Sequence, residues 1–199
     1  MKNTVFFLLF LSLLTAPLAN THAKSGKKEV SLRLSPKLGA LFKLKDGVLG
    51  RAVRRFVYIL PEGNLNIQIT EHWFASASFI YAKFRGKLAG GSGGHINVYG
   101  PTAGIKLVSS SNATSSGDFL DDSRWWFGLE SGPYFTDLRV SPVVPPQRST
   151  GFGFNFGAGF DYFFHENWAA GLETKLHYVN LAVDDYYLLS FGPHLIARF

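Results

Sequence analysis

Ionisable side chains recur at alternate positions in several apolar segments of this sequence. Glu173, Lys175 and His177 form one such series. Residues two apart in a β-strand point to the same face, so these groups would gather on one side of a sheet. The full set is Arg33, Lys37, Lys106, Glu130, Asp161, Glu173, Lys175, His177, His194 and Arg198. Acidic and basic groups held on one buried face can pair with each other, or they can pass ions or protons along it.

Other residue types that could do chemistry lack the surroundings they need. Gly151, Gly153, Gly157 and Gly159 lie inside an alternating segment and not between a strand and a helix, so they do not predict a phosphate-binding loop. The six histidines show no metal-ligand spacing, and the chain has no cysteine. The net charge of +6 comes without a basic helix or a base-stacking motif. We therefore expect no metal, no cofactor and no nucleic acid partner.

The residues between the ionisable groups place them in a sheet. From Phe152 to Phe164, every second residue is apolar and mostly aromatic. The intervening residues are mostly glycine or polar: Gly153, Asn155, Gly157, Gly159 and Asp161, followed by Phe163. A soluble sheet would carry polar side chains opposite its core face. An aromatic face backed by glycines instead indicates a lipid-facing wall around a narrow, crowded interior.

The same two-residue period predicts eight strands. Their expected ranges are 29–44, 56–70, 73–85, 95–108, 123–137, 151–164, 168–180 and 186–199. Pro61-Glu62-Gly63 interrupts the second, where we expect a bulge or a shortened strand. An even number of such strands predicts an all-β fold, an antiparallel up-and-down transmembrane barrel. The interior of an eight-stranded barrel is filled by side chains, so its inward charges should pair and plug the lumen.

The first residues have the pattern of an exported protein. Lys2 precedes an apolar run from Val5 to Leu14, and small residues follow up to Ala23, as in a signal peptide that is cleaved there. The run is about half the ~20 residues that a spanning helix needs. The expected organisation is a signal peptide over 1–23 and one barrel domain over 24–199. The remainder has no apolar run of helix-spanning length, so an integral protein must here be a closed barrel.

Tryptophans and charges give this barrel a direction. Trp73 and Trp168 each follow a tight link, and Trp125 begins another odd-numbered strand, so the three predict an aromatic girdle at the periplasmic interface. Basic residues near the opposite links form an outer rim: Arg51, Arg54, Arg55, Arg85 and Lys87. This rim would face the phosphate-rich sugar lipid of the outer leaflet; ordinary solvation of loops explains the same charges equally well. The link 109–122 is long for a periplasmic turn.

The C-terminal part of the chain resembles a known family. Residues 157–178, GAGFDYFFHENWAAGLETKLHY, are similar to a hairpin of the outer-membrane β-barrel domain family, the small OmpA/OmpX-like and porin-like barrels. The terminal Phe199, with apolar residues at alternate positions before it, is similar to the signal read by the barrel-assembly machinery. The resemblance implies an integral protein of the Gram-negative outer membrane in contact with its lipids, lipopolysaccharide included, and we expect a monomer. Activity does not follow, because this family hosts adhesins, structural barrels, channels and lipid-modifying enzymes.

His177-Tyr178-Val179-Asn180 is similar to the His-Tyr-Ser-Asn motif of lipid A 3-O-deacylases, small barrels with a Ser–His mechanism. Val179 stands at the serine position, so the nucleophile that His177 would activate is missing. The alternation also turns His177 toward the lumen, away from lipid. We therefore expect no enzyme but a structural or surface-interacting barrel with a plugged lumen. A narrow porin-like channel for ions or small solutes is the alternative, and a lipid A-modifying enzyme is a third hypothesis.

Overall fold

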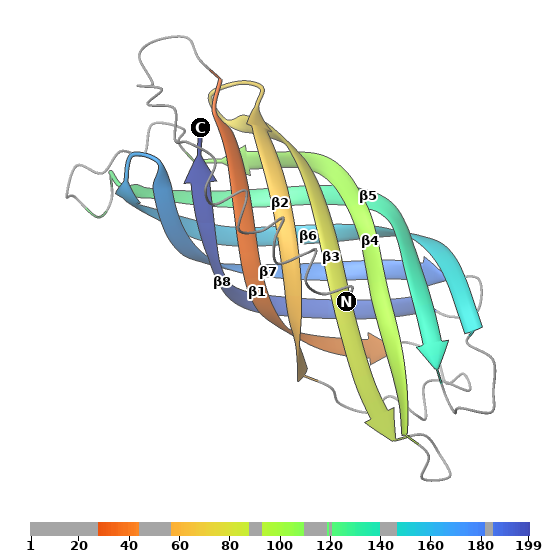
Figure 1. Ribbon diagram of the computed structural model, residues 1–199. Helices are drawn as coiled ribbons and strands as arrows, with labels where there is room; N and C mark the ends of the chain where they lie inside the picture. Colours follow the sequence, from red (N-terminus) through yellow and green to blue (C-terminus); the bar gives the residue numbers. More distant parts are fainter. Residues whose placement is uncertain are drawn as a thin grey trace.

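The computed structural model describes residues 28–43, 57–87, 93–109, 119, 121–139, 147–181 and 185–199. Eight strands follow one another along the chain: β1 (Val30–Lys43), β2 (Val57–Gln68), β3 (Trp73–Lys87), β4 (Gly93–Val108), β5 (Ser123–Arg139), β6 (Gln147–His165), β7 (Trp168–Leu181) and β8 (Asp185–Arg198). Each strand pairs with the next in antiparallel fashion, and β8 pairs with β1, so the sheet closes into a barrel (Figure 1). The predicted eight-stranded barrel is therefore confirmed.

The signal peptide predicted for residues 1–23 lies outside the described residues. No helix in the described part of the chain is long and apolar enough to cross a membrane.

The proline in β2 does not bulge the strand. β1 and β2 pair in continuous register through Pro36↔Pro61 and Ser35↔Glu62, so of the two predicted outcomes, a bulge or a shortened strand, the bulge is absent from this ladder. β2 is nevertheless short, with 12 residues against 14 in β1 and 15 in β3. The interruption falls on the other edge, where β2 pairs with β3 only between Glu62↔Ile80 and Gln68↔Phe74. Because Pro61 has no amide hydrogen, it cannot donate to a ladder.

The outer wall carries the apolar side chains, as the alternation predicted. On β6, Phe152, Phe154 and Phe156 are 53%, 50% and 54% exposed, whereas the residues between them are buried. On six strands the last apolar residue of this outward face is aromatic: Tyr81, Tyr99, Phe135, Phe152, Tyr178 and Tyr187. The next outward residue is polar in each case, namely Lys83, Asn97, Asp137, Thr150, Asn180 and Asp185. These aromatic residues form a second girdle, toward the end where β3 stops and β4 begins, which the sequence analysis did not identify. We refer to it as the outer girdle.

Glycines on the inner face make room for large inward side chains of β5. A Cβ atom at Gly159 would lie 2.6 Å from the indole ring of Trp126, and one at Gly153 would lie 2.7 Å from the ring of Tyr134. Both aromatic side chains are almost completely buried. The glycine face of β6 therefore reflects a crowded interior, as the sequence predicted.

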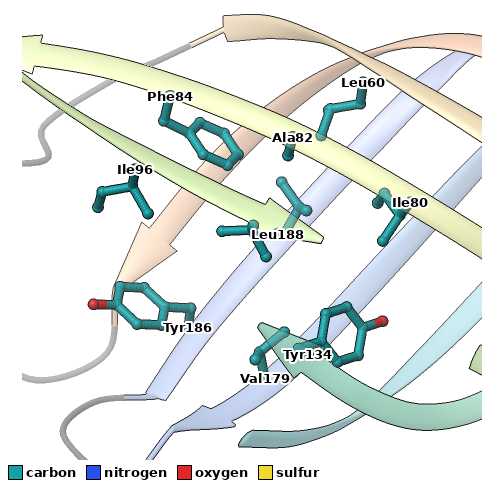
Figure 2. Packing of buried hydrophobic residues seen from close by; sticks show 10 residues of the cluster. Leu60, Ile80, Ala82, Phe84, Ile96, Tyr134, Val179, Tyr186 and Leu188 are labelled. Atoms are coloured by element: carbon teal, nitrogen blue, oxygen red, sulfur yellow. The ribbon is translucent and has the colours of Figure 1, made fainter. Parts of the chain in front are cut away.

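The lumen has an apolar part and a polar part. Toward the end where the link from β3 to β4 lies, ten buried residues from six strands pack together: Leu60, Ile80, Ala82, Phe84, Ile96, Val98, Tyr134, Val179, Tyr186 and Leu188 (Figure 2). We refer to this group as the apolar cap. The rest of the lumen, toward the end where β1 begins and β8 ends, holds the buried charged side chains.

Candidate functional site in the lumen

Buried charges of alternating sign form a continuous series across the polar part of the lumen. In order of contact it runs Glu29, Arg124, Asp161, Arg33, Glu173, Lys37, Glu62, Lys175 and Glu130, and we refer to it as the charge chain. Glu29 lies just before β1, and the other residues point inward from β1, β2, β5, β6 and β7. The parity of five different strands therefore places these side chains in one lumen.

The contacts along the charge chain are short. Arg124 lies 3.1 Å from Glu29 and 3.2 Å from Asp161. Arg33 then bridges Asp161 at 3.0 Å and Glu173 at 2.9 Å. Each of these side chains is at most 7% exposed. Every charge in this half of the series therefore has an oppositely charged neighbour, as buried ions require.

Two lysines continue the series on its other side. Lys37 lies 2.8 Å from Glu173 and 2.5 Å from Glu62. Lys175 contacts Glu62 and lies 3.4 Å from Glu130. All five side chains are at most 2% exposed. Glu62 thus joins the two lysines and makes the series continuous.

Asp161 is the first of two carboxylates that collect several donors. Besides the guanidinium groups of Arg33 and Arg124, it accepts a hydrogen bond from Trp126 Nε1 at 3.1 Å. His194 Nε2 lies 2.8 Å from Asp161 Oδ1. These partners come from β1, β5 and β8, so one carboxylate on β6 ties three other strands together.

Glu130 is the second such carboxylate. Its Oε1 accepts from Asn64 Nδ2 at 3.1 Å, from Ser78 at 2.9 Å and from the hydroxyl of Ser76. Its Oε2 accepts from Thr102 at 2.9 Å and from Asn155 at 3.1 Å. Hydroxyl and amide donors thus supply much of the solvation that water would otherwise give this buried charge.

Lys106 joins the network through neutral groups. Its ammonium donates to Asn64 Oδ1 at 2.6 Å and lies 4.7 Å from the centroid of the Trp126 ring. The guanidinium of Arg33 lies 4.3 Å from the same ring. Trp126 therefore contacts two cations through its π face and Asp161 through its N–H.

The structure places the eight residues predicted for the lumen network in three settings. Arg33, Lys37, Glu130, Asp161, Glu173 and Lys175 belong to the charge chain. His177 lies apart from it, with Nδ1 3.0 Å from the hydroxyl of Tyr134 beside the apolar cap. Arg198 lies at the barrel end, 3.4 Å from Glu29 and over the ring of Phe163 at 4.0 Å. Arg198 thus contacts Glu29, the first member of the charge chain.

Three members of the charge chain were missed in the sequence. Glu62 was treated as part of a Pro-Glu-Gly interruption, although it has the same parity as the buried Asn64. Arg124 has the parity of Trp126, and Glu29 has the parity of Arg33. The three residues could have been found by continuing the inward-facing positions two residues further at the strand ends. In β2, the same alternation had only to be followed through Pro61.

The other predicted residues that the structure describes lie at the two ends of the barrel. Trp73 and Trp125 are 42% and 60% exposed and Trp168 is half-buried. All three lie at the start of an odd-numbered strand, and so at the barrel end where β8 stops. Phe199 is 50% exposed and donates its backbone N–H to the carbonyl of Val30 at 2.8 Å. Of the basic rim, Arg85 and Lys87 belong to the last three residues of β3, and Arg51, Arg54 and Arg55 lie outside the described residues.

Comparison with known proteins gives a likeness of fold. No family model and no curated protein matches the sequence. The crystal structure of Ail, the attachment invasion locus protein of Yersinia pestis, in complex with the heparin analogue sucrose octasulfate matches with a TM-score of 0.54 and 15% identity over 87% of this chain and 100% of that chain. Neisserial surface protein A matches with a TM-score of 0.59 and 11% identity over 86% and 97% of the two chains. The outer membrane protein OprG from Pseudomonas aeruginosa matches with 0.53 and 11% over 85% and 95%.

The fold and the outer wall together define the class of this protein. A closed sheet leaves no unpaired edge strand, and its wall exposes aromatic and aliphatic side chains between two girdles. Such a wall is suited to lipid, because a closed barrel satisfies its backbone groups internally. The chain has the fold of these small outer-membrane barrels, and its outer wall is suited to a lipid bilayer.

Proposed function

We propose that this barrel is a structural and surface-interacting component of the outer membrane, without catalytic activity, and that its lumen is plugged by the charge chain. The observation that carries the proposal is that side chains from opposite walls meet. Glu29, which precedes β1, contacts Arg124 on β5, and the ammonium of Lys175 on β7 lies 3.4 Å from the hydroxyl of Ser78 on β3. In a barrel of eight strands these strands face each other, so contacts between them cross the lumen.

The apolar cap supports the same proposal from the other half of the lumen. Its ten residues are at most 7% exposed, and they turn toward one another from six strands (Figure 2). An ion that entered from this side would have to leave water for an apolar surrounding, which is costly. The polar and apolar parts thus oppose permeation by different means.

The geometry around His177 favours a barrel without lipid-cleaving activity. His177 is 1% exposed, its Nδ1 lies beside Tyr134, and Val179 belongs to the apolar cap. A lipid A ester bond in the bilayer would approach the outer wall, on the other side of the sheet. Mass spectra of lipid A from cells that produce the protein should show unchanged acyl chains; loss of one chain would contradict this part of the proposal.

Phe199 is positioned to act in assembly as well as in closure. Its backbone ties the chain end to Val30, while its ring is 50% exposed. We expect Phe199→Ala to lower the amount of barrel assembled in cells, because the machinery would lose the side chain it reads. Phe164→Ala is the matched control, since Phe164 is 53% exposed at the same barrel end. An equal effect of both substitutions would contradict a recognition role.

Conductance of planar bilayers tests the plug. The purified barrel should give no steady current steps, whereas a conducting porin in the same bilayers serves as the positive control. Reproducible single-channel steps would contradict the proposed plug. They would support the alternative function, a narrow channel for ions or small solutes.

A further inference from the structure

The apolar band on the outer wall is shorter on β3 than on β5. On β3 the band runs from Trp73 to Tyr81 of the outer girdle, which stand eight residues apart. On β5 it runs from Trp125 to Phe135, which stand ten residues apart. A strand rises about 3.3 Å per residue and is tilted by about 40° in a membrane barrel. The two missing residues therefore correspond to roughly 5 Å of membrane thickness.

The ladders show that the outer end of the band is displaced on β3. Across β4, Trp73 lies in one row with Phe127, so the band of β5 begins two residues before that row, at Trp125. Tyr81 lies in one row with Phe135, so the outer ends of the two bands show no such offset. Because the strands of a barrel are tilted and staggered, a level boundary must be offset between strands. An outer boundary parallel to the tryptophans would fall at position 83 of β3.

Polar side chains occupy this level on both β3 and β4. Lys83 and Asn97 are direct ladder partners, and both are half-buried on the outward face. The hydroxyl of Tyr81 donates to Asn97 Oδ1 at 3.5 Å. The long stem of a lysine can carry its ammonium toward the headgroups, but an asparagine amide is too short for this. Counted from the tryptophan of each strand, the polar surface therefore begins two residues earlier on β3 than on β5, where it begins at Asp137.

The uneven band cannot be removed by inclining the barrel. On β7, which lies opposite β3 in the closed sheet, Trp168 and Tyr178 again stand ten residues apart. Tilting the whole barrel moves both ends of the band on one strand in the same direction, so it cannot make a short band match a thicker membrane. The membrane itself therefore has to adapt beside β3 and β4.

We propose that the barrel thins the bilayer on one side, so that headgroups beside β3 and β4 lie at the level of Lys83 and Asn97, roughly 5 Å closer to the midplane than beside β5 and β7. The inference rests on the proposed function, in which the barrel spans the outer membrane, and the predicted orientation makes the thinned leaflet the outer one. Lipid headgroups are the occupant that fits, because an ammonium and an amide are costly in hydrocarbon, whereas a bilayer takes up a small mismatch at modest cost.

The pairing of β2 supports thinning at the same place. In the ladders formed by the described residues, β2 pairs with β3 only up to Glu62↔Ile80, next to Tyr81, and residues 58–60 pair with β1 alone. Backbone groups without a ladder partner are costly in hydrocarbon and are tolerated where water or headgroups reach them. Headgroups at the level of Lys83 would come within reach of this stretch of β2.

Three matched positions measure the membrane beside each strand. Phe79, Ser131 and Thr174 each lie six residues after a tryptophan, on the outward faces of β3, β5 and β7. Because the chain has no cysteine, Phe79→Cys, Ser131→Cys and Thr174→Cys each create a single site for a nitroxide spin label. The ratio of its accessibilities to oxygen and to a water-soluble nickel complex reports its depth in dioleoylphosphatidylcholine vesicles. Glu71→Cys, in the exposed short link between β2 and β3, gives the aqueous reference, and heat-modifiable migration on gels verifies that each labelled barrel is folded.

The label at position 79 should have an oxygen-to-nickel ratio several-fold below those at positions 131 and 174, because the headgroups lie nearer to it. Lys83→Leu combined with Asn97→Leu should raise the ratio at position 79 toward that at position 131, since the band on β3 and β4 then has its full height. Asn180→Leu, which extends the band on the opposite wall, is the matched control and should leave the ratio at position 79 unchanged.

Equal ratios at positions 79, 131 and 174, all well above that at position 71, would overturn the thinning and leave the proposed function intact. A low ratio at position 79 that the two leucines do not raise would also contradict the thinning, because the polar pair would not set the depth of the headgroups. Ratios as low as that at position 71 for all three labels would overturn the proposed function as well, since the outer wall would then not lie in lipid.

Discussion

At the scale of single residues, the lumen depends on matched volumes as much as on matched charges. Trp126 occupies space that Gly159 leaves open, and it contacts Arg33, Lys106 and Asp161 at once. A displacement of this indole would therefore disturb hydrogen bonds and cation–π contacts together. The glycine at position 159 thus supports the charge chain, although it has no side chain of its own.

Gly159→Ala is expected to destabilise the barrel, because its Cβ would lie 2.6 Å from Trp126 in a filled interior. Overpacking of this kind costs about 1–3 kcal/mol of the free energy of unfolding. Gly63→Ala is the matched control, since the nearest atom to its Cβ would be Leu34 at 3.9 Å, an ordinary contact. Urea unfolding in lipid vesicles measures both. Equal stability of the two variants would contradict the role assigned to Gly159.

At the scale of elements, all eight strands pair with their neighbours in antiparallel fashion, but the ladders between them differ in length. β3 and β4 are paired from Trp73↔Leu107 to Lys87↔Gly93. In the ladders formed by the described residues, by contrast, Val57–Pro61 pair with β1 and have no pair on β3. We refer to this stretch, which is paired on one side only, as the seam. It begins opposite Tyr81 of the outer girdle. We therefore expect it to lie at the edge of the hydrocarbon region, where water can solvate backbone groups.

Amide hydrogen exchange should find this seam. Residues 58–60 of β2 have ladder partners on one side, whereas residues 64–66 have partners on β1 and β3, so the first group should lose protection sooner. Both groups lie on the same strand, which makes the second an internal control. Equal protection of the two groups would mean that further contacts protect residues 58–60.

The bounds of a strand could be predicted from the sequence where one face of the strand is apolar and the other faces the polar or crowded lumen, because the side chains then alternate. β7 was predicted as 168–180 and runs from Trp168 to Leu181. β6, in contrast, begins at Gln147 and not at 151, because residues 147–150 are polar on both faces and show no alternation. Above the outer girdle water surrounds the wall, so the chemical contrast that marks a strand disappears.

From the sequence, the site could be predicted only as a set of side chains that point into the lumen, without their partners. Parity identified Asp161 and Glu173 as inward-facing, but it could not show that Arg33 bridges them, because cross-lumen partners depend on the stagger of all eight strands. Glu62 was missed because proline and glycine beside it suggested a break.

At the scale of the whole molecule, the barrel has an apolar outer wall between two girdles and a lumen that holds the charge chain and the apolar cap. Positive charge stands directly beyond the outer girdle, where Lys83 follows Tyr81 on the outward face of β3 and Arg85 and Lys87 come next in the strand. We propose that this edge contacts the phosphate groups of lipopolysaccharide.

Replacement of Lys83, Arg85 and Lys87 by glutamine should therefore reduce the rise in unfolding temperature that lipopolysaccharide gives to the barrel in vesicles. Arg139→Gln is the control, because Arg139 lies at the same end and already has a partner, Asp137, at 3.3 Å. If the triple variant keeps the full rise, these charges serve solvation of the loops alone.

The most direct test of the charge chain is the free energy of unfolding of Glu173→Gln, measured by urea titration in lipid vesicles. Glu173 lies between Arg33 and Lys37, so the substitution leaves two buried cations short of a partner and should cost about 3–5 kcal/mol. Asp137→Asn removes a pair in which Arg139 is 52% exposed, and it should cost less than about 1 kcal/mol. If Glu173→Gln is no less stable than Asp137→Asn, the buried charges do not hold the barrel together across its lumen.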